Sequence, residues 1–563
     1  MSDDEDLRAH FNGELMLGHG IRGPSPFYLS LEDLKETSVH VLGASGTGKS
    51  FWIRNLIDQF LIHRQAFGII DPHRGELVDY ALSRLRRAGV PPKDIVLIDP
   101  SDGRYAVGFN PLACGISDAG ETTGLVLDAF LKAWGAESFD STPRLEGVLR
   151  GVIRTLAENK LTLLDSYEFL NVDNASLRRA LLAQVPDRFV QQDWAEYEKL
   201  AKPDRLALFE STRNRLRRLL HAAPLQHMFA QTQNTLDFRR LLDEGKFLLV
   251  NLGGVAAPET QRLLGALIVN GIYHAAKLRD SRRRRDWYLL CDEFGSYCST
   301  DFIGALTELR KFGAHVLMAH QYLAQLDDED RGLAAAVTTN ARIKVVFGGL
   351  SRDDAERMAR ELFTGQVHGN RVKHVAVQTK FRPIDEVFTT ETESWSDGDS
   401  DSDSRGRSEG RTTNDFDVDH SGSSTSTESE TRSRGSTWSH GHSRSQVPIT
   451  LHEEFEEETG RQFYSLDEEW EKRIARIHGL PVRHALIKVY NRPVVHIVTP
   501  DVEGDQRDER LDRFQNKVMV ECPYVKPVNV VVKQIEERRQ ALALLTEKTK
   551  TGDRPMDVKS FRE

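Results

Sequence analysis

The stretch HVLGASGTGKSFWIRNL, residues 40–56, constrains the fold of this chain more than any other part of its sequence. An apolar run leads into a glycine-rich turn, and a helical pattern follows the turn. Gly43, Gly48, Lys49 and Ser50 satisfy the pattern G-x-x-x-x-G-K-[ST] between a strand and a helix, which is typical of a phosphate-binding loop. The sequence therefore predicts a nucleoside triphosphate site; the alternative is a glycine-rich turn with an incidental lysine.

Each part of this loop has an expected task. Glycines let backbone N–H groups converge on phosphates, and the helix N-terminus adds a partial positive charge. Lys49 is expected to reach the outer phosphates and the Ser50 hydroxyl to bind Mg²⁺, so ATP and Mg²⁺ are the expected cofactors. The predicted nucleotide-binding residues are Gly43, Ala44, Ser45, Gly46, Thr47, Gly48, Lys49 and Ser50.

Two acids follow the apolar run WYLLC at residues 287–291. A strand that ends in Asp292 and Glu293 brings both carboxylates to the carboxyl edge of a parallel sheet, beside the phosphate-binding loop. Asp292 is expected to orient the magnesium shell, and Glu293 to polarise the attacking water. Without the loop, two acids at this place more often form an ordinary solvated strand end.

Two further polar residues are candidates for catalysis. Gln321 ends the run AHVLMAH, where an amide can sense the γ-phosphate or position water, but a strand-terminating glutamine is also a common turn residue. Arg310 precedes that run and is a candidate arginine finger for the phosphate of an adjacent subunit. Its alternative is a surface ion pair with Glu308 or another acid.

The chain alternates short apolar runs with amphipathic segments, which predicts an α/β fold with a mostly parallel sheet covered by helices. The predicted strands are residues 38–43, 66–71, 94–99, 246–252, 287–293, 314–320 and 342–348. Between residue 110 and about residue 235 the strand signal disappears and helical patterns replace it. That segment is predicted to be an all-helical insertion between two strands of the sheet.

Composition changes sharply at residues 391–446, which contain sixteen serines among fifty-six residues. Such an acidic, Ser-rich segment buries too little apolar area to offset its ordering entropy, so we expect a disordered loop. The alternative is folding on a partner. Residues 484–500 again resemble two strands around a turn and are expected to return to the edge of the sheet.

The predicted organisation has six segments. They are 1–110, the first part of the nucleotide-binding core; 111–235, the insertion; 236–390, the second part of the core with the acidic pair; 391–446, the disordered linker; 447–503, the return to the sheet edge; and 504–563, a charged, partly helical tail.

Composition also limits the setting in which the chain is expected to work. No run approaches eighteen apolar residues, the start MSDDEDLRAHF is acidic, and four scattered cysteines lack zinc spacing, so a cytoplasmic chain without a membrane anchor is expected. The net charge of −10 argues against a uniformly basic nucleic-acid coat. It still permits a local basic channel. The candidate basic clusters, each of which could instead be a solvated face, are Arg213, Arg215, Arg217 and Arg218, and Arg282 to Arg285.

Several motifs occur together in the order of one known superfamily. HVLGASGTGKS, GIIDPHRGELVDYAL, IVLIDPSDGRYAVGFNPL, LLDEGKFLLVNLGG, YLLCDEFGSYCSTDFIGALTELRKFGAHVLMAHQYLAQL and NARIKVVFGGLSRDDAERMA follow one another between residues 14 and 365. Together they resemble the HerA/FtsK superfamily, specifically soluble relatives of type IV secretion coupling proteins of the TraG/TraD type. The resemblance also extends weakly over residues 460–500.

The resemblance implies a RecA-like P-loop ATPase core, a homohexameric ring and DNA in its central pore. By motif position it implies nucleotide contacts from Lys49 and Ser50, magnesium and water roles for Asp292 and Glu293, and a role for the strand-ending Gln321. The chain departs from the family pattern D-P-H-G-[DE] through an extra Arg74, which leaves the role of Glu76 open. From its sequence we also expect neither the transmembrane start of membrane-bound relatives nor the small N-terminal barrel of HerA proteins in this chain.

Two functions remain open. The first is a ring-shaped ATPase that translocates DNA, of unknown strandedness, in conjugation, repair or phage defence. The second is a nucleotide-controlled assembly platform that recruits a nuclease, a relaxase or another effector. The acidic charge balance, the Ser-rich loop and the charged tail favour the platform; the motif set favours the motor.

Overall fold

The computed structural model describes two compact units. The core unit comprises Met1–His368 and Leu466–Glu563, and the hairpin unit comprises Gly369–Ser465. The described residues are 13–21, 25–73, 75–113, 118–134, 143–233, 235–280, 282, 284–298, 304, 306, 308–327, 332–367, 371–396, 406–409, 426–429, 439–502, 504 and 507–551.

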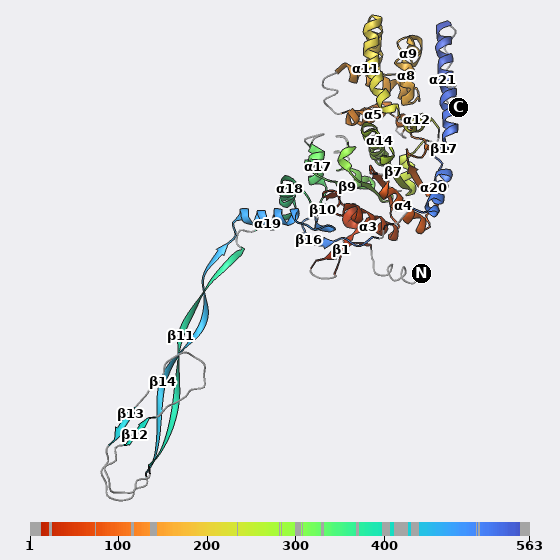
Figure 1. Cartoon of the computed structure of the whole chain (residues 1–563). Helices are drawn as coiled ribbons and strands as arrows, with labels where there is room; N and C mark the ends of the chain where they lie inside the picture. Colours follow the sequence, from red (N-terminus) through yellow and green to blue (C-terminus); the bar gives the residue numbers. More distant parts are fainter. Residues whose placement is uncertain are drawn as a thin grey trace, which may run out of the picture. The chain divides into compact units, whose positions relative to one another are not determined.

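The core unit is built on an 11-stranded sheet with the order β2-β1-β16-β15-β10-β3-β9-β8-β4-β7-β5 (Figure 1). Neighbouring strands from β10 to β5 are parallel, which confirms the predicted mostly parallel α/β fold. All predicted core runs form strands: β3 (Val39–Leu42), β4 (Ala66–Asp71), β5 (Ile95–Ile98), β7 (Phe247–Asn251), β8 (Trp287–Cys291), β9 (Ala314–His320) and β10 (Ile343–Phe347).

The parallel strands are apolar throughout because helices cover both faces of the sheet. In β7, for example, Leu248 and Val250 contribute to one hydrophobic core, and Leu249 contributes to the other. The first core includes residues of α14 (Pro258–Lys277) and of the insertion, and the second includes residues of α3 (Lys49–Ile62), α4 (Glu76–Arg87) and α20 (Glu509–Glu521). A third core joins β10 and β15 to α18 (Arg352–Phe363) and α19 (Leu466–His478).

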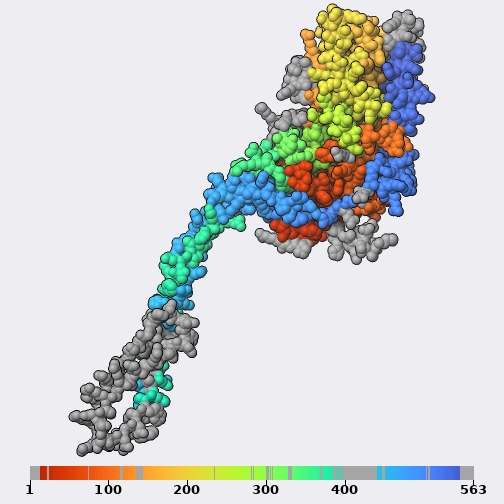
Figure 2. Space-filling model, viewed as in Figure 1, coloured from red at the N-terminus to blue at the C-terminus, as the bar shows by residue number. Residues whose placement is uncertain are grey.

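The segment between β6 (Tyr105–Val107) and β7 is helical, as predicted for the insertion. The last helix, α21 (Val528–Thr551), contacts this insertion, and β17 (Val525–Pro527) pairs with β6. Figure 2 shows the insertion in orange and yellow beside the blue C-terminal segment. The insertion contains α5 (Ala119–Trp134), α7 (Pro143–Glu158), α8 (Ser166–Phe169), α9 (Ala175–Leu182), α10 (Arg188–Lys199), α11 (Lys202–Leu220) and α12 (Ala223–Phe229); α13 (Phe238–Glu244) leads into β7.

The two strands predicted within residues 484–500 join the sheet as β15 (His484–Val489) and β16 (Val495–Val498). They do not form its edge. β1 (Glu14–Gly20) pairs with β16, and β2 (Pro26–Ser30) pairs with β1, so the N-terminal hairpin extends the sheet beyond them. The short segment before the first core strand therefore adds two strands to the shared sheet.

The hairpin unit consists mainly of β11 (Val372–Ser396) paired antiparallel with β14 (Ser439–Phe463). Residues 391–396 and 439–446, predicted as disordered, belong to these strands, and β12 (Gly406–Glu409) pairs with β13 (Ser426–Ser429). The rest of 391–446 lies outside the described residues. Cross-strand ion pairs offer a reason for the order: Arg382 with Glu453 at 2.7 Å, and Arg444 with Glu391 at 2.9 Å.

Two global features accompany this fold. Among the helices of the described residues, none combines the length and apolarity that a membrane crossing requires. Cys291, Cys298 and Cys522 are buried and form no disulfide within the described part of the chain, whereas Cys114 lies outside the described residues.

Candidate nucleotide-binding and hydrolysis site

The glycine-rich loop connects β3 to α3, as the motif predicts. Gly43 follows β3 directly and lies so close to β10 that an added Cβ would be 2.5 Å from Phe347 Cβ. Gly48 caps α3 with a φ of 114°, a conformation that L side chains rarely adopt. Within the loop, Thr47 Oγ1 donates to the Ala44 carbonyl at 2.7 Å. These constraints fix the loop at the carboxyl edge of the sheet.

Lys49 is the first residue of α3, and its side chain folds back over the loop. Its ammonium donates to the Gly43 carbonyl at 2.5 Å and to the Ala44 carbonyl at 3.1 Å. Burial lowers the pKa of Lys49, while the nearby carboxylates of Glu293 and Asp292 act in the opposite direction. The side chain is therefore a buried cation held between the loop and the acidic pair.

The acidic pair follows β8 directly. Glu293 has a φ of 47° and begins a 3-10 turn, η5 (Phe294–Ser296), so the chain bends sharply after Asp292. The Tyr297 hydroxyl donates to the Asp292 carbonyl and the Ser296 hydroxyl to the Glu293 carbonyl, each at 2.8 Å. Burial, followed by the charge of Glu293, raises the pKa of Asp292 to about 6. A bound cation would favour the ionised form of Asp292.

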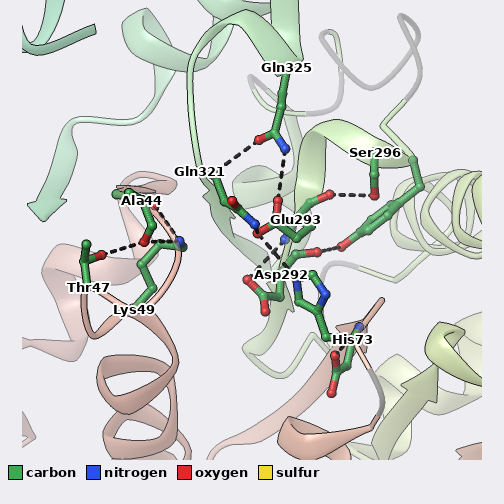
Figure 3. A network of polar contacts seen from close by, with 12 residues as sticks. Ala44, Thr47, Lys49, His73, Asp292, Glu293, Ser296, Gln321 and Gln325 are labelled. Carbon is green, nitrogen blue, oxygen red and sulfur yellow. Dashed lines mark hydrogen bonds and ion pairs between the residues drawn. The ribbon is translucent and has the colours of Figure 1, made fainter. Parts of the chain in front are cut away.

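Glu293 is surrounded by side-chain donors (Figure 3). Gln321 Nε2 donates to its Oε1 at 2.8 Å, Gln325 Nε2 donates to its Oε2 at 3.2 Å, and His73 Nε2 lies 3.5 Å from Oε1. Burial alone would raise the pKa of Glu293, but these three side chains lower it. Contact with Glu293 in turn raises the pKa of His73.

The structure thus brings Lys49, Asp292, Glu293 and Gln321 together at one edge of the sheet. In the described part of the chain, no cluster of three or more His, Cys, Asp or Glu residues is placed to hold a metal. A magnesium ion at this edge would depend on Ser50, Asp292 and phosphate oxygens. Such a donor set suits Mg²⁺, which commonly binds through one or two protein ligands, phosphates and water.

Asp71 ends β4 and organises the turn that follows. Its carboxylate accepts from the His73 N–H at 2.8 Å and from the Leu77 N–H at 2.9 Å. Burial, opposed by these two donors, raises the pKa of Asp71 to about 7. Glu76 is exposed in the first turn of α4 and lies 3.7 Å from Arg54, so it points to that arginine; Arg74 lies outside the described residues.

Arg310 lies away from this cluster. It belongs to η6 (Leu309–Phe312), which precedes the amino end of β9, and it donates to the Glu36 carbonyl at 2.6 Å. The alternative partner Glu308 accepts instead from the Tyr273 hydroxyl at 3.2 Å. Within its own chain Arg310 is therefore separated from the phosphate-binding loop by the length of the strands.

Three residues near the site were not singled out from the sequence. His73 and Gln325 contact Glu293, and the only sequence signals are the DPH run after β4 and a second glutamine one helical turn after Gln321. The third is Arg483, whose N–H donates to the Thr47 carbonyl at 2.8 Å. Its position beside the loop depends on a chain return of more than four hundred residues, for which no local signal exists.

The basic clusters separate into different environments. Arg213 lies 3.8 Å from the Tyr167 ring centroid and Arg215 lies 5.9 Å from that of Trp134. In the second cluster, the Arg284 guanidinium stacks 5.1 Å from the Phe312 ring centroid. Several of the remaining cations gather in one open groove.

We call this the insertion groove. It has a volume of about 910 Å³ and lies between α5, α11 and the start of α14. Arg218 pairs there with Glu259 at 2.8 Å, whereas in the described part of the chain neither Arg217 nor Arg262 contacts a carboxylate. The groove is lined by Ala133, Trp134, Asn214, Arg217, Arg218, His221, Ala257, Pro258, Glu259, Thr260 and Arg262.

Comparison with known proteins adds a family and two related folds. Residues 29–395 match the family described as the type IV secretion-system coupling protein DNA-binding domain. The bacterial conjugative coupling protein TrwBdeltaN70 in its unbound monoclinic form has 17% identity and a TM-score of 0.50, with 90% of this chain and 93% of that chain covered. The plasmid coupling protein TrwB with the GTP analogue GDPNP has 16% identity and a TM-score of 0.51, with 90% and 94% covered. No curated protein sequence matches the chain.

Proposed function

The chain belongs to the type IV secretion-system coupling protein DNA-binding domain family, and on this premise we propose that it is an ATP-hydrolysing ring motor that translocates DNA. The observation that carries the proposal is the convergence of Lys49, Asp292, Glu293 and Gln321 at the carboxyl edge of β3, β8 and β9. Lys49 supplies charge for the outer phosphates, and Glu293 accepts a proton from the attacking water.

Nucleotide binding is assigned to the loop from Gly43 to Ser50, and Mg²⁺ binding to Ser50 and Asp292. The related TrwB structure is a complex with a GTP analogue. For this chain ATP is the proposed nucleotide, and Mg²⁺ supplies charge neutralisation at the phosphates when bound. A homohexameric ring, with Arg310 acting on the nucleotide of a neighbouring subunit, is part of the same proposal.

The insertion groove supports DNA as the substrate. Arg217, Arg218 and Arg262 place three guanidinium groups along one groove, and Glu259 is the one carboxylate among the described residues that line it. Guanidinium groups pair well with phosphate oxygens, and the affinity of such contacts falls steeply with salt. The groove therefore offers a local basic surface despite the net charge of −10.

The test compares Glu293→Gln with the parent chain in the purified oligomer. The parent is expected to hydrolyse ATP faster when DNA is added, and Glu293→Gln to bind ATP but lose turnover by at least a hundredfold, since a positioned base contributes about 10²–10⁴-fold. DNA that neither binds nor stimulates hydrolysis would refute the motor. Lys49→Ala, expected to abolish nucleotide binding, serves as the control for the loop itself.

A nucleotide-controlled assembly platform is the second candidate, and the hairpin unit favours it. Its strands expose several large apolar side chains, including Phe381 at 58% and Val377 at 47% exposure, which a bound protein would cover. Under this alternative the nucleotide-bound oligomer recruits a nuclease, a relaxase or another effector. Full biological function of Glu293→Gln would favour the platform, and loss of function would favour the motor.

A further inference from the structure

Glu293 receives support from both strands that flank its own strand. β8 lies between β4 and β9, and each neighbour ends in a loop that contacts the Glu293 carboxylate. His73 comes from the loop after β4, whereas Gln321 and Gln325 follow β9 (Figure 3). Gln325 belongs to the short helix α16 (Ala324–Asp327). The three side chains therefore approach one carboxylate from two sides.

The contacts divide unequally between the two oxygens of Glu293. Oε1 faces both Gln321 Nε2 at 2.8 Å and His73 Nε2 at 3.5 Å, while Oε2 faces Gln325 Nε2 at 3.2 Å. An ionised carboxylate offers about four acceptor directions. Gln321 occupies one direction on Oε1, which His73 also approaches, and Gln325 occupies one direction on Oε2, so one acceptor direction of Oε2 stays open. The network therefore both fixes the plane of the carboxylate and leaves a defined place for one more proton.

We propose that His73 and Gln325 are positioning residues for hydrolysis, which hold Glu293 so that the remaining acceptor direction of Oε2 receives a proton of the attacking water. This inference rests on the proposed ATPase function. Neither residue touches nucleotide in this assignment; both act through Glu293. Since a misplacement of about 1 Å at a reacting group can cost about a hundredfold in rate, loss of either donor is expected to slow turnover.

The side chains of His73 and Gln325 make few other contacts that would stabilise the fold. The His73 side chain is 56% exposed, and the turn after β4 uses its backbone N–H, which donates to Asp71. Among the described residues, the Gln325 side chain has one further hydrogen bond, in which its Oε1 accepts from the Gln321 N–H at 3.1 Å. A carboxylate at position 325 would keep that acceptor, but it would remove the donor to Glu293 and place a second negative charge beside it.

The experiment measures steady-state ATP hydrolysis by the full chain and four variants: His73→Ala, His73→Gln, Gln325→Ala and Gln325→Glu. We expect kcat to fall about tenfold to a hundredfold in His73→Ala, Gln325→Ala and Gln325→Glu, with KM and the affinity for a nonhydrolysable ATP analogue changed less than about twofold. His73→Gln retains a side-chain N–H and is expected to recover most of the rate. Gln192→Ala, which alters an exposed glutamine on α10, is the matched control and should behave like the parent.

The outcomes distinguish this inference from the proposed function. Parental turnover in Gln325→Glu, or equal loss in His73→Ala and His73→Gln, would overturn the positioning roles while the parent remains an ATPase. A rise in KM that accounts for the whole loss would also overturn them, because it indicates weaker binding rather than slower chemistry. A parent chain that does not hydrolyse ATP would refute the proposed function, and the positioning roles with it.

Discussion

Gly48 is the position where the phosphate-binding loop and the C-terminal part of the chain depend most directly on each other. Its φ of 114° places the backbone where an alanine is strained, and an added Cβ would lie 3.0 Å from the Arg483 Cα. The backbone of Arg483 is held in place, because its N–H donates to the Thr47 carbonyl at 2.8 Å. The substitution Gly48→Ala therefore perturbs both the loop and the segment that packs against it.

The loss of stability expected for Gly48→Ala has two contributions. The backbone conformation costs an alanine about 1–3 kcal/mol. Overpacking against a backbone atom that is fixed by a hydrogen bond costs about 1–3 kcal/mol more. We therefore expect Gly48→Ala to lose about 2–6 kcal/mol of stability in the native loop conformation. If the loop relaxes to avoid this strain, nucleotide binding must restore it, and each 1.4 kcal/mol of restored strain costs about tenfold in affinity.

The assay is urea unfolding together with the affinity for a nonhydrolysable ATP analogue. Gly89→Ala is the control: Gly89 has a φ of 72° but nothing within 4 Å of an added Cβ, so it isolates backbone strain from steric overlap. We expect Gly89→Ala to lose about 1–2 kcal/mol and to keep parental nucleotide affinity. Gly48→Ala should lose more stability and at least tenfold in affinity. Equal behaviour of the two variants would refute the role of the Arg483 contact.

Two further predictions concern the insertion groove and the buried acid of the core. Reversing the charges of Arg217 and Arg262 to Glu should weaken DNA binding and reduce the slope of log affinity against log salt by about 2, whereas the same reversals at the exposed Arg188 and Arg510 should leave the slope unchanged. The pKa of Asp71 is about 7 in the folded chain, against 3.8 for an ordinary aspartate, so folding favours its protonated form. Its contribution to the free energy of unfolding is therefore complete below about pH 4 and is lost as the pH rises through 7. Asp71→Asn removes this dependence, and its free energy of unfolding relative to the parent should rise by about 1.4 kcal/mol per pH unit between about pH 5 and 7. A difference that stays constant with pH would contradict the burial of the charge.

The parallel part of the fold could be predicted from the sequence because each of its strands is apolar on both faces. Runs such as KFLLVNL have no polar alternation and cannot be surface strands, and the structure places them between two helical layers. The N-terminal strands were harder to predict. β1 and β2 are short, and β1 pairs with β16, a strand nearly five hundred residues away, so their sequence carries no sign of the partner. The strands of the hairpin unit were not predicted, because their sequence is polar. In the structure, cross-strand ion pairs stabilise them.

Some residues of the candidate site could be predicted from the local sequence, whereas others depend on the order of the strands in the sheet. Lys49, Asp292 and Gln321 each follow or precede a recognisable strand, and their types match a known chemistry at a strand end. The role of His73 depends instead on the order in which strands lie side by side. Because β4 and β9 flank β8, residues separated by more than two hundred positions converge on Glu293.

Strand order also connects the contacts around Glu293 to the phosphate-binding loop. β9 lies between β8 and β3, so the loop that begins with Gln321 borders both the acidic pair and the phosphate-binding loop. The connection to the latter is direct, since the Gly43 N–H donates to the His320 carbonyl at 3.3 Å, and Gln321 follows at once with its side chain on Glu293. A displacement of the phosphate-binding loop that shifts β9 by a fraction of an ångström must therefore change the Gln321–Glu293 contact. The fold thus gives the proposed hydrolysis a means to depend on how a bound triphosphate is held.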